Sequence, residues 1–381
     1  MGKSGSVNVW LLSAAAFLYM AGVGATLAVF PVAVKAAGGS DLDVGLVIGA
    51  WSLIYLLANI PAGMVLDKAG PSRLVPLGFG MNILVSALYM GGSIPLYLAG
   101  RGLEGVLEAL AWTGVFGYTA KENKEGVLAS FGTVYGSMAL GFTLGPSLGS
   151  ALYSAAGEKT VFASLGLFSL AAGAAAWAAL RGVEPPRSSR GRILPPLGGL
   201  RHPVAALSVA LAFLIGMFES NLVSYSPGIA AAVGLPESGG GYVISTYYLA
   251  SLVSQFGLRV THGMVEGSLW PLLAYTVVLV GLASARSGLG LAAAIAVAGF
   301  VDAATTSRIQ ARLSGILEGA ESTAIGLGNA SWALGYTTGA PLHASLAPWA
   351  GPVEWLFVMA AAMFAAAAAL SAVERLWRGR R

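Results

Sequence analysis

Residues 357–370 read FVMAAAMFAAAAAL. The strands of a transmembrane β-barrel alternate polar and apolar residues over about ten positions, and this run does not alternate, so it predicts a helix. Other apolar stretches along the chain also reach the ~20 residues that a helix needs to cross a bilayer. We predict twelve spans, at residues 8–34, 42–66, 74–93, 96–119, 126–152, 160–181, 204–232, 239–261, 268–286, 289–311, 319–344 and 351–374.

The composition supports a membrane protein. Among 381 residues, 56% are hydrophobic and 10% are charged, whereas a soluble domain has roughly 25% charged residues. So few charges cannot cover a water-soluble protein of this size, so we expect an all-α integral membrane protein. Cysteine is absent, and His202, His262 and His343 lie far apart. Disulfides and the usual metal-ligand spacings are therefore excluded, and we expect neither a metal nor a cofactor.

Lysine and arginine predict the orientation, because cytoplasmic loops carry an excess of both. We assign 17 of the 21 to the two tails and the even-numbered loops. Lys35, Lys159 and Arg286 fall in odd-numbered loops, and Arg101 lies inside a span. This bias predicts a multi-pass plasma-membrane protein with both termini in the cytoplasm. It also accounts for the net charge of +4 without a nucleic-acid partner.

One stretch differs from the rest of the chain. Residues 181–203 read RGVEPPRSSRGRILPPLGGLRHP, with five prolines and five arginines. Such a composition is typical of a linker. We therefore predict a six-helix bundle at 1–181, a cytoplasmic linker at 182–203 and a second six-helix bundle at 204–381.

The two halves resemble each other. A shift of 194 positions pairs Glu108 with Asp302, and a shift of 196 pairs Asn59 with Gln255. The first shift also pairs glycines, namely Gly105 with Gly299, Gly132 with Gly326, Gly141 with Gly335 and Gly145 with Gly339. Parallel repeats of this kind are typical of transporters whose halves rock around a site at the bilayer midplane.

The connection after the second span reads GMVLDKAGPSR at residues 63–73. Gly63 permits close approach of another helix, and Gly70 permits a tight turn. Asp67 lies at a helix boundary, where a carboxylate can cap backbone N–H groups or pair with a cation such as Lys68 or Arg73.

The fifth span contains GFTLGPSLG at residues 141–149. Gly141, Gly145 and Gly149 form one smooth face for helix packing, and Pro146 bends the helix.

This stretch resembles the antiporter signature of the major facilitator superfamily, and residues 63–73 resemble its loop signature, with Pro71 and Ser72 where basic residues are usual. The resemblance implies that superfamily's twelve-helix fold, a secondary transporter of the drug/proton antiporter branch, and a role for Asp67 in stabilising the outward-facing state. Generic glycine packing is the alternative explanation of residues 141–149.

Charged residues also lie inside the spans: Arg101, Glu104, Glu108, Glu219 and Asp302. The stretch from Arg101 to Gly105 resembles the superfamily's Arg-x-x-Gln-Gly motif, associated with proton transfer, with Glu104 in place of Gln. A charge at this depth costs at least ~2.5–3.5 kcal/mol, and burial with mutual repulsion favours neutral acids.

We predict that Glu108, Asp302 or both carry the transported proton. Glu219 is expected to bind a cationic substrate or to be a second protonation site. Arg101 is expected to hold Glu104 ionised, and a purely structural ion pair remains open. Seven further side chains can line a substrate cavity or serve only in packing: Asn59, Gln255, Asn221, Tyr225, Tyr247, Asn329 and Trp332.

These features favour proton-coupled export of a small cationic or amphipathic molecule by alternating access. The alternative is a proton-coupled symporter or facilitator for a sugar, organic acid or peptide, in which Arg101 holds an anionic group. We expect no enzyme, because no nucleophile–base pair is legible, and no ATP use, because the P-loop sequence is missing. The expected partners are the substrate, protons and the lipid bilayer, with the protein acting as a monomer.

Overall fold

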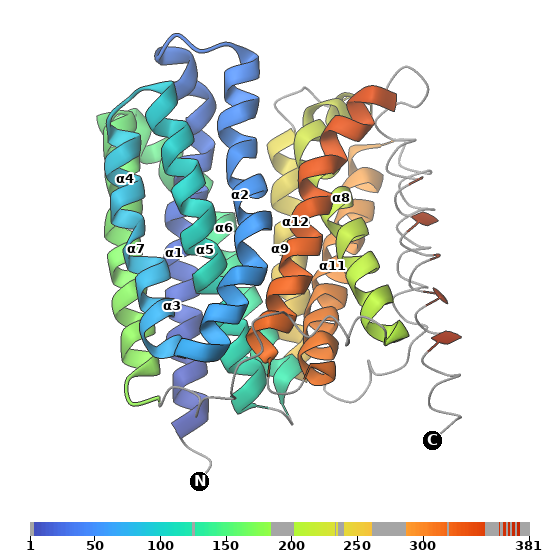
Figure 1. The fold of residues 1–381 in the computed structure, drawn as a ribbon. Helices are drawn as coiled ribbons and strands as arrows, with labels where there is room; N and C mark the ends of the chain where they lie inside the picture. The colour runs from blue at the N-terminus through green and yellow to red at the C-terminus, as the bar shows by residue number, and fades with distance from the viewer. Residues whose placement is uncertain are drawn as a thin grey trace.

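The computed structural model describes residues 4–123, 126–183, 202–232, 234, 240–260, 287–317 and 320–346, with single positions between 358 and 373. The described elements are α-helices, as the sequence predicts (Figure 1). Residues 184–201 of the linker, the predicted span at 268–286 and nearly all of that at 351–374 lie outside the described residues.

The helices stand side by side along a common direction (Figure 1). Their bounds are α1 Ser4–Ala36, α2 Asp41–Ala69, α3 Pro71–Gly80, α4 Asn82–Met90, α5 Ile94–Glu122, α6 Val127–Ala156, α7 Glu158–Leu180, α8 Pro203–Ala232, α9 Gly240–Val260, α11 Gly288–Ile316 and α12 Glu321–Leu346. Seven segments of the described chain are long and apolar enough to cross a membrane. The more polar sequences of α5, α9 and α12 keep these helices outside that set.

Two details differ from the predicted spans. The span expected at 74–93 is present as one candidate membrane span, Pro71–Met90, but it consists of two helices, α3 and α4, which meet at Met81. Arg308 and Arg312, two of the 17 lysines and arginines that we counted in the tails and even-numbered loops, lie in the last third of α11. A helix at the membrane surface can extend beyond the apolar stretch that defines the span, because its last turns lie among polar headgroups.

Local sequence explains how α2 begins and ends. Ser40 caps its first turn, since the Ser40 hydroxyl accepts from the Asp43 N–H at 3.2 Å and the Asp43 carboxylate accepts from the Ser40 N–H at 2.7 Å. This reciprocal pair is a capping box. At the other end Gly70 has φ 79°, which glycine adopts without strain, and Pro71 opens α3.

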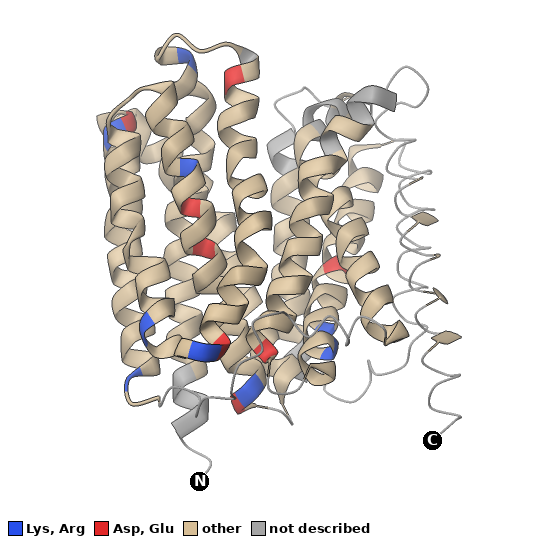
Figure 2. Ribbon diagram, in the orientation of Figure 1, with Lys and Arg blue, Asp and Glu red and all other residues tan. Residues whose placement is uncertain are grey.

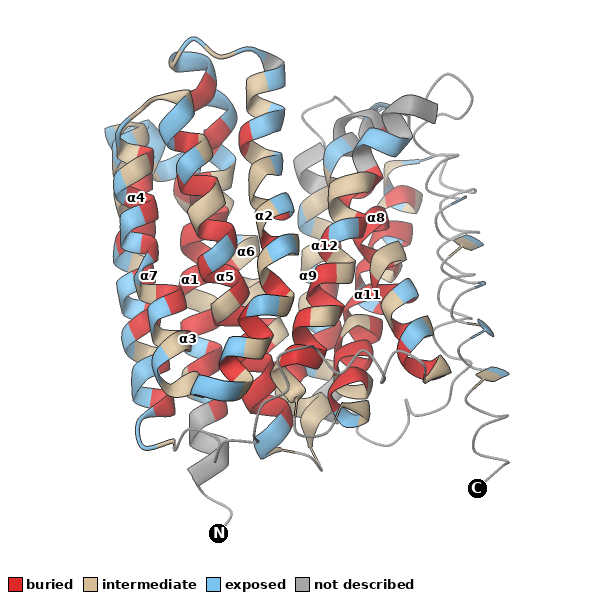
Figure 3. Cartoon of the chain, in the orientation of Figure 1, coloured by how far each residue is buried: buried red, intermediate tan, exposed pale blue. Residues whose placement is uncertain are grey.

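The outer surface of the helices is apolar, and polar groups concentrate elsewhere. Large side chains such as Leu42, Leu57, Leu167 and Leu289 are exposed, and exposed positions follow the outer faces in Figure 3. Figure 2 shows the charged residues near the helix ends, with few at mid-height. This distribution suits a chain whose sides contact lipid.

Glycines allow the same close helix contacts in both halves. A Cβ on Gly105 of α5 would lie 2.8 Å from the Trp51 carbonyl of α2. Gly299 of α11 meets the Tyr247 carbonyl of α9 in the same way. The two glycines are 194 positions apart and their partners 196, so the repeat detected in the sequence corresponds to a repeated packing contact.

A second repeated contact involves the glycine face of α6. A Cβ on Gly145 would lie 2.6 Å from the Ala21 carbonyl of α1. Its counterpart Gly339 of α12 would place a Cβ 2.7 Å from the Met217 carbonyl of α8. The residues of the antiporter-like stretch therefore pack α6 directly against α1.

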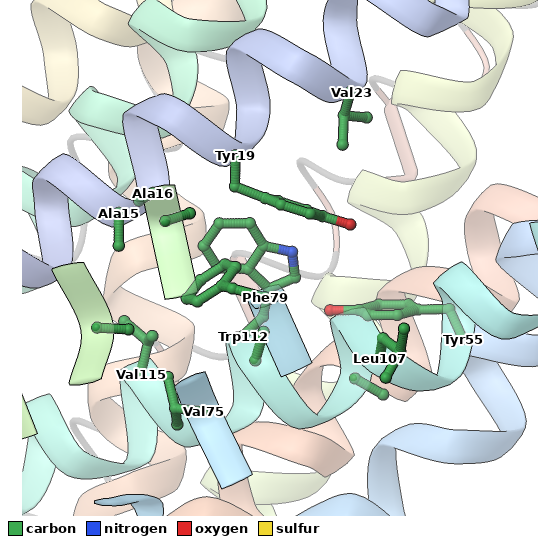
Figure 4. Close-up of a cluster of buried hydrophobic side chains, with 14 of the residues drawn as sticks. Ala15, Ala16, Tyr19, Val23, Tyr55, Val75, Phe79, Leu107, Trp112 and Val115 are labelled. Atoms are coloured by element: carbon green, nitrogen blue, oxygen red, sulfur yellow. The ribbon is translucent and has the colours of Figure 1, made fainter. Parts of the chain in front are cut away.

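Buried apolar residues form two clusters, one drawn mainly from α1–α7 and one from α8, α9, α11 and α12. Figure 4 shows part of the first, where Tyr19, Phe79 and Trp112 pack together with ring centroids 5.1–5.8 Å apart. Ile325 and Ala333 of α12 also belong to the first cluster. The α12 helix thus packs against both groups of helices.

We expect Gly145→Ala to destabilise the protein, because the new methyl group meets backbone that cannot move aside. Overpacking of this kind costs about 1–3 kcal/mol, and the melting temperature in detergent should fall. Gly45→Ala is the control, since a Cβ at Gly45 of α2 meets nothing within 4 Å. Equal melting temperatures for the two variants would contradict the close α1–α6 contact.

Candidate functional site

A cavity of about 280 Å³ lies between the two groups of helices. Its wall includes three carboxylates, Glu108, Glu219 and Asp302, and one arginine, Arg101. Aromatic side chains make up much of the remainder: Trp51, Tyr55, Trp112, Phe116, Tyr135, Phe142, Tyr247, Tyr248, Trp332 and Tyr336.

The carboxylates lie at mid-height in the bundle. Glu108 is at the centre of α5, and Asp302 is at the centre of α11. Both are 3% exposed. Glu219 lies just beyond the middle of α8. The sequence predicted this depth, and the structure adds that all three face the same cavity.

Two aromatic donors hold Glu108. The Tyr19 hydroxyl of α1 donates to one carboxylate oxygen at 3.0 Å, and the Trp51 indole N–H of α2 donates to the other at 3.1 Å. Both oxygens therefore have a partner, and the carboxyl group is fixed between three helices.

Asp302 has a similar arrangement in the second half. The Tyr247 hydroxyl of α9 donates to one oxygen, and the Thr306 hydroxyl donates to the other at 3.3 Å. Tyr247 is 196 positions after Trp51. The repeat thus places an aromatic donor on the helix beside the buried acid in each half.

The predicted pair of amides repeats as well. The Thr113 hydroxyl donates to Asn59 Oδ1 at 3.0 Å, and the Ser307 hydroxyl donates to Gln255 Oε1 at 2.7 Å. Thr113 and Ser307 are 194 positions apart. Each amide therefore ties α2 to α5 or α9 to α11, beneath the corresponding carboxylate.

Glu219 has no counterpart in the first half, where the equivalent position is Val23. The Tyr248 hydroxyl donates to one of its oxygens at 2.9 Å, and the Trp332 indole N–H donates to the other at 3.0 Å. The Tyr336 ring lies tilted against the Trp332 ring, with centroids 5.1 Å apart. The carboxylate is thus surrounded by aromatic rings.

Arg101 is engaged on every side. It forms a buried ion pair with Glu104, and its Nε donates to the Val47 carbonyl at 3.3 Å. Its guanidinium lies 5.5 Å from the Phe30 ring and 5.6 Å from the Trp51 ring. Glu104 in turn accepts from the Tyr89 hydroxyl at 2.6 Å and is absent from the cavity wall.

The structure places five predicted substrate residues in the cavity wall, Glu219, Gln255, Tyr247, Asn329 and Trp332. Asn59 and Asn221 are not in it. Asn221 donates to the Met217 carbonyl of its own helix at 2.7 Å, and Asn59 does the same to Tyr55 at 2.6 Å. The side chain of Tyr225 lies outside the described part of the chain.

Sequence reasoning missed several residues of the site, all of them in the cavity wall except Tyr19. Tyr19, Trp51 and Tyr248 donate to the buried acids, and Gln310 lies lower in the wall. The repeat gave a signal for Trp51, because the shift of 196 relates it to Tyr247. No pattern along the chain marks Tyr19, whose counterpart at that shift is Ile215.

Asp67 joins the end of α2 to the start of α12. Its carboxylate accepts from the N–H groups of Ser322 and Thr323 at 3.0 and 2.9 Å, and from the Thr323 hydroxyl at 2.5 Å. It thereby caps a helix from the other half, where the helix dipole favours a negative charge. A Cβ on Gly63 would lie 2.6 Å from the Ser322 carbonyl. We call this end of the bundle the Asp67 end.

Contacts between α2 and α12 continue from the Asp67 end to mid-height, where the two helices run side by side (Figure 1). The Trp51 and Trp332 rings meet edge to face at 6.4 Å, and the Thr337 hydroxyl donates to the Ser52 hydroxyl at 3.1 Å. The cavity is therefore closed toward the Asp67 end by helix contacts between the two groups.

A family model described as Major Facilitator Superfamily matches residues 12–266. The chain belongs to this superfamily. It is therefore a multi-pass membrane protein of a superfamily of transporters, as the sequence motifs indicated.

Sequence relatives within the superfamily are distant. An uncharacterized MFS-type transporter of Methanocaldococcus jannaschii is 26% identical over 174 residues, 45% of each chain. The quinolone resistance protein NorA of Staphylococcus aureus is 26% identical over 135 residues, 35% of each chain. The alignments thus span less than half the length of these two relatives.

Solved structures show the same fold over nearly the whole chain. The human organic anion transporter MFSD10 (TETRAN) has a TM-score of 0.83 at 17% identity, covering 96% of this chain and 99% of that one. The outward conformation of the transporter FucP has a TM-score of 0.77 at 15% identity, with the same coverage. The predicted fold class, the major facilitator fold, is confirmed.

We expect Asp67→Ala to open the Asp67 end. The chain has no cysteine, so Ile325→Cys introduces a unique thiol at a position that is 0% exposed in the cluster shared by both groups of helices. Its reaction with a water-soluble maleimide should be slow. On the Asp67→Ala background it should accelerate about tenfold or more, because losing ~1.4 kcal/mol of closure already changes the population tenfold.

The matched control is Lys68→Ala, which removes the adjacent charge and leaves the Asp67 hydrogen bonds in place. Labelling should then stay slow. Equal labelling rates on the Asp67→Ala and Lys68→Ala backgrounds would show that Asp67 does not hold the two helices together.

Proposed function

We propose that this protein is a proton-coupled exporter of a small cationic or amphipathic molecule. One observation carries the proposal: three carboxylates from both halves face a single cavity, while Arg101, the only cation among the described residues of the wall, is already paired with Glu104. An excess of carboxylates favours cations in the cavity, whether these are protons or substrate.

In this proposal Glu108 and Asp302 carry protons. Each lies at the centre of its helix and accepts hydrogen bonds from an aromatic donor of a neighbouring helix. Those donors stabilise the carboxylate form, and proton binding weakens that interaction. The two forms thus differ in how strongly the acid holds α2 to α5 or α9 to α11, which couples protonation to helix movement.

Glu219 is proposed to bind the cationic group of the substrate. Tyr248 and Trp332 fix its carboxylate, and Tyr336 lies beside Trp332. Aromatic faces attract cations by about 0.5–2 kcal/mol, more when the site is desolvated. A flat or amphipathic cation can therefore stack on the rings while its charge meets Glu219.

We place the Asp67 end in the cytoplasm, following the lysine and arginine bias. The cavity closed at that end then corresponds to an outward-facing state, which Asp67 stabilises. The halves at 1–181 and 204–381 are proposed to rock about the cavity, joined by the linker at 182–203. The similarity to the quinolone resistance protein NorA supports export, and we propose a monomer in the plasma membrane.

Uptake of a sugar, organic acid or peptide is the alternative. The structural relatives include a human organic anion transporter and a bacterial fucose:proton symporter, and Arg101 in the cavity wall would be the anion ligand. The contacts of Arg101 count against this, because its ion pair and two aromatic rings leave little of the guanidinium for a substrate.

We expect Glu108→Gln and Asp302→Asn each to abolish proton-driven transport. Vesicles containing the purified protein and an acidic lumen should accumulate the cationic dye ethidium from outside, as protons leave. Neither variant should exceed protein-free vesicles. Both should retain exchange of ethidium between equal pools without a pH gradient, because that exchange needs the folded cavity but no proton transfer.

Glu122→Gln is the control, since Glu122 lies exposed at the end of α5, and it should transport normally. Wild-type accumulation by both Glu108→Gln and Asp302→Asn would refute the proton assignment. Uptake stimulated by acid outside the vesicles would favour the symporter instead.

A further inference from the structure

Two amide side chains meet in the lower wall of the cavity. Gln310 of α11 donates through Nε2 to Asn329 Oδ1 of α12 at 2.7 Å. Both residues line the cavity, and they are 4% and 8% exposed. Each lies toward the Asp67 end of its helix, below the level of the carboxylates.

The pair leaves one acceptor and one donor unused. Gln310 Oε1 and Asn329 Nδ2 are buried without a hydrogen-bond partner among the described residues, and the Tyr135 side chain of the cavity wall lies beside the Gln310 amide. Exchanging oxygen and nitrogen in both amides would leave the same balance, one free acceptor and one free donor. Buried polar groups are nearly always hydrogen-bonded, and among the described buried atoms that lack a partner only these two belong to residues of the cavity wall.

Gln255 provides the comparison. It also lines the cavity, yet its carbonyl accepts from Ser307 at 2.7 Å and its amide donates to the Ala303 carbonyl at 2.7 Å. Gln255 is thus fully engaged by the protein, whereas Gln310 and Asn329 together present an unused donor and acceptor.

A glycine keeps the space beside the free acceptor open. A Cβ on Gly328 would lie 2.8 Å from Gln310 Oε1 and 3.0 Å from a Leu313 methyl carbon. Gly328 also lines the cavity. Any larger residue there would contact the carbonyl oxygen and restrict access to it.

The amide pair lies at a defined distance from the acids. Gln310 follows Asp302 by eight residues on α11, which is roughly 12 Å at 1.5 Å per residue. Asn329 lies one turn before Trp332, whose indole holds Glu219. The cavity therefore has a charged region at mid-height and a neutral hydrogen-bonding region about two turns below, with aromatic side chains between them.

We propose that Gln310 and Asn329 form a substrate subsite for a neutral group that carries a donor beside an acceptor, such as a carboxamide. The preferred substrate is then an elongated molecule with an amine at one end and an amide toward the other. The cation-binding end of this assignment rests on the function proposed above. The amide end rests on the unused atoms and on Gly328.

N-(8-aminooctyl)acetamide and 8-aminooctyl acetate test the subsite, because an eight-carbon chain lets the amine and the amide reach regions about two helical turns apart. The two compounds differ only in an amide N–H replaced by an ester oxygen. Binding to the purified protein is measured by the change in tryptophan fluorescence. The acetamide should bind about tenfold more tightly, the factor that corresponds to one lost hydrogen bond of ordinary strength. Equal affinities, or no binding of either compound, would overturn the proposal.

Variants locate the preference. Gln310→Met and Asn329→Leu should each bring the affinity ratio close to one, and Gly328→Ala should reduce it. Gln255→Met is the matched control and should keep the tenfold ratio even if it lowers stability, since a ratio does not depend on the fraction folded. A ratio unchanged in Gln310→Met, or lost equally in Gln255→Met, would show that the amide pair does not contact ligand.

Glu219→Gln separates this inference from the proposed function. If Glu219 binds the amine, the variant should weaken both compounds by the same factor and leave their ratio intact. If both affinities persist with the ratio intact, the cation assignment fails and the amide subsite stands. If the ratio is one in the wild type while Glu219→Gln weakens both, the subsite fails and the cation assignment stands.

Discussion

Burial of carboxylates at the middle of a membrane bundle is the constraint on which the rest of the structure depends. A charged side chain at that depth costs several kcal/mol, and every hydrogen bond that it can make there is worth more than in water. Glu108, Glu219 and Asp302 each accept two hydrogen bonds, and five of the six donors come from neighbouring helices. The hydrogen bonds that stabilise the buried carboxylates are therefore also contacts between helices, and a change in the protonation of one acid changes those contacts.

Aromatic residues can both pack between the helices and donate to the carboxylates, because they combine a large apolar surface with one polar atom. Trp51 illustrates the combination: its indole N–H holds Glu108, its ring covers Arg101, and its edge meets Trp332, whose own N–H holds Glu219. A carboxylate of the first half is thus connected to one of the second through two tryptophan rings. Separation of the halves has to break that ring contact, so the proposed proton and substrate sites are mechanically linked without touching each other.

The sequence was sufficient for the spans that fall in the described part of the chain, for the repeat and for the depth of the acids, since each follows from hydrophobicity, spacing or helix geometry along one segment. It was insufficient wherever the answer depends on which helices are neighbours. Tyr19 looks like any tyrosine of an apolar span until α1 is packed against α5. Asn59 looks like a substrate ligand until Thr113 and the Tyr55 carbonyl are seen to engage it. The interruption at Met81 was missed although Pro76, Gly78 and Gly80 precede it, because the hydrophobicity that defined the span is continuous there.

Departures from the repeat indicate where the halves have taken different tasks. The shared parts are the acid at mid-helix, the aromatic donor beside it and the amide below. Arg101 and Glu104 correspond to Ile295 and Ala298, and Glu219 corresponds to Val23, so the first half has an additional ion pair and the second an additional acid. Arg101 and Glu104 neutralise each other, whereas Glu219 adds a carboxylate to the second half without a cationic partner among the described residues, and by Coulomb's law a cationic substrate prefers that half. The asymmetry therefore supports proton binding mainly at Glu108 and substrate binding mainly at Glu219. Asp302 lines the same cavity, so a proton bound there and a cationic substrate compete for the same negative charge.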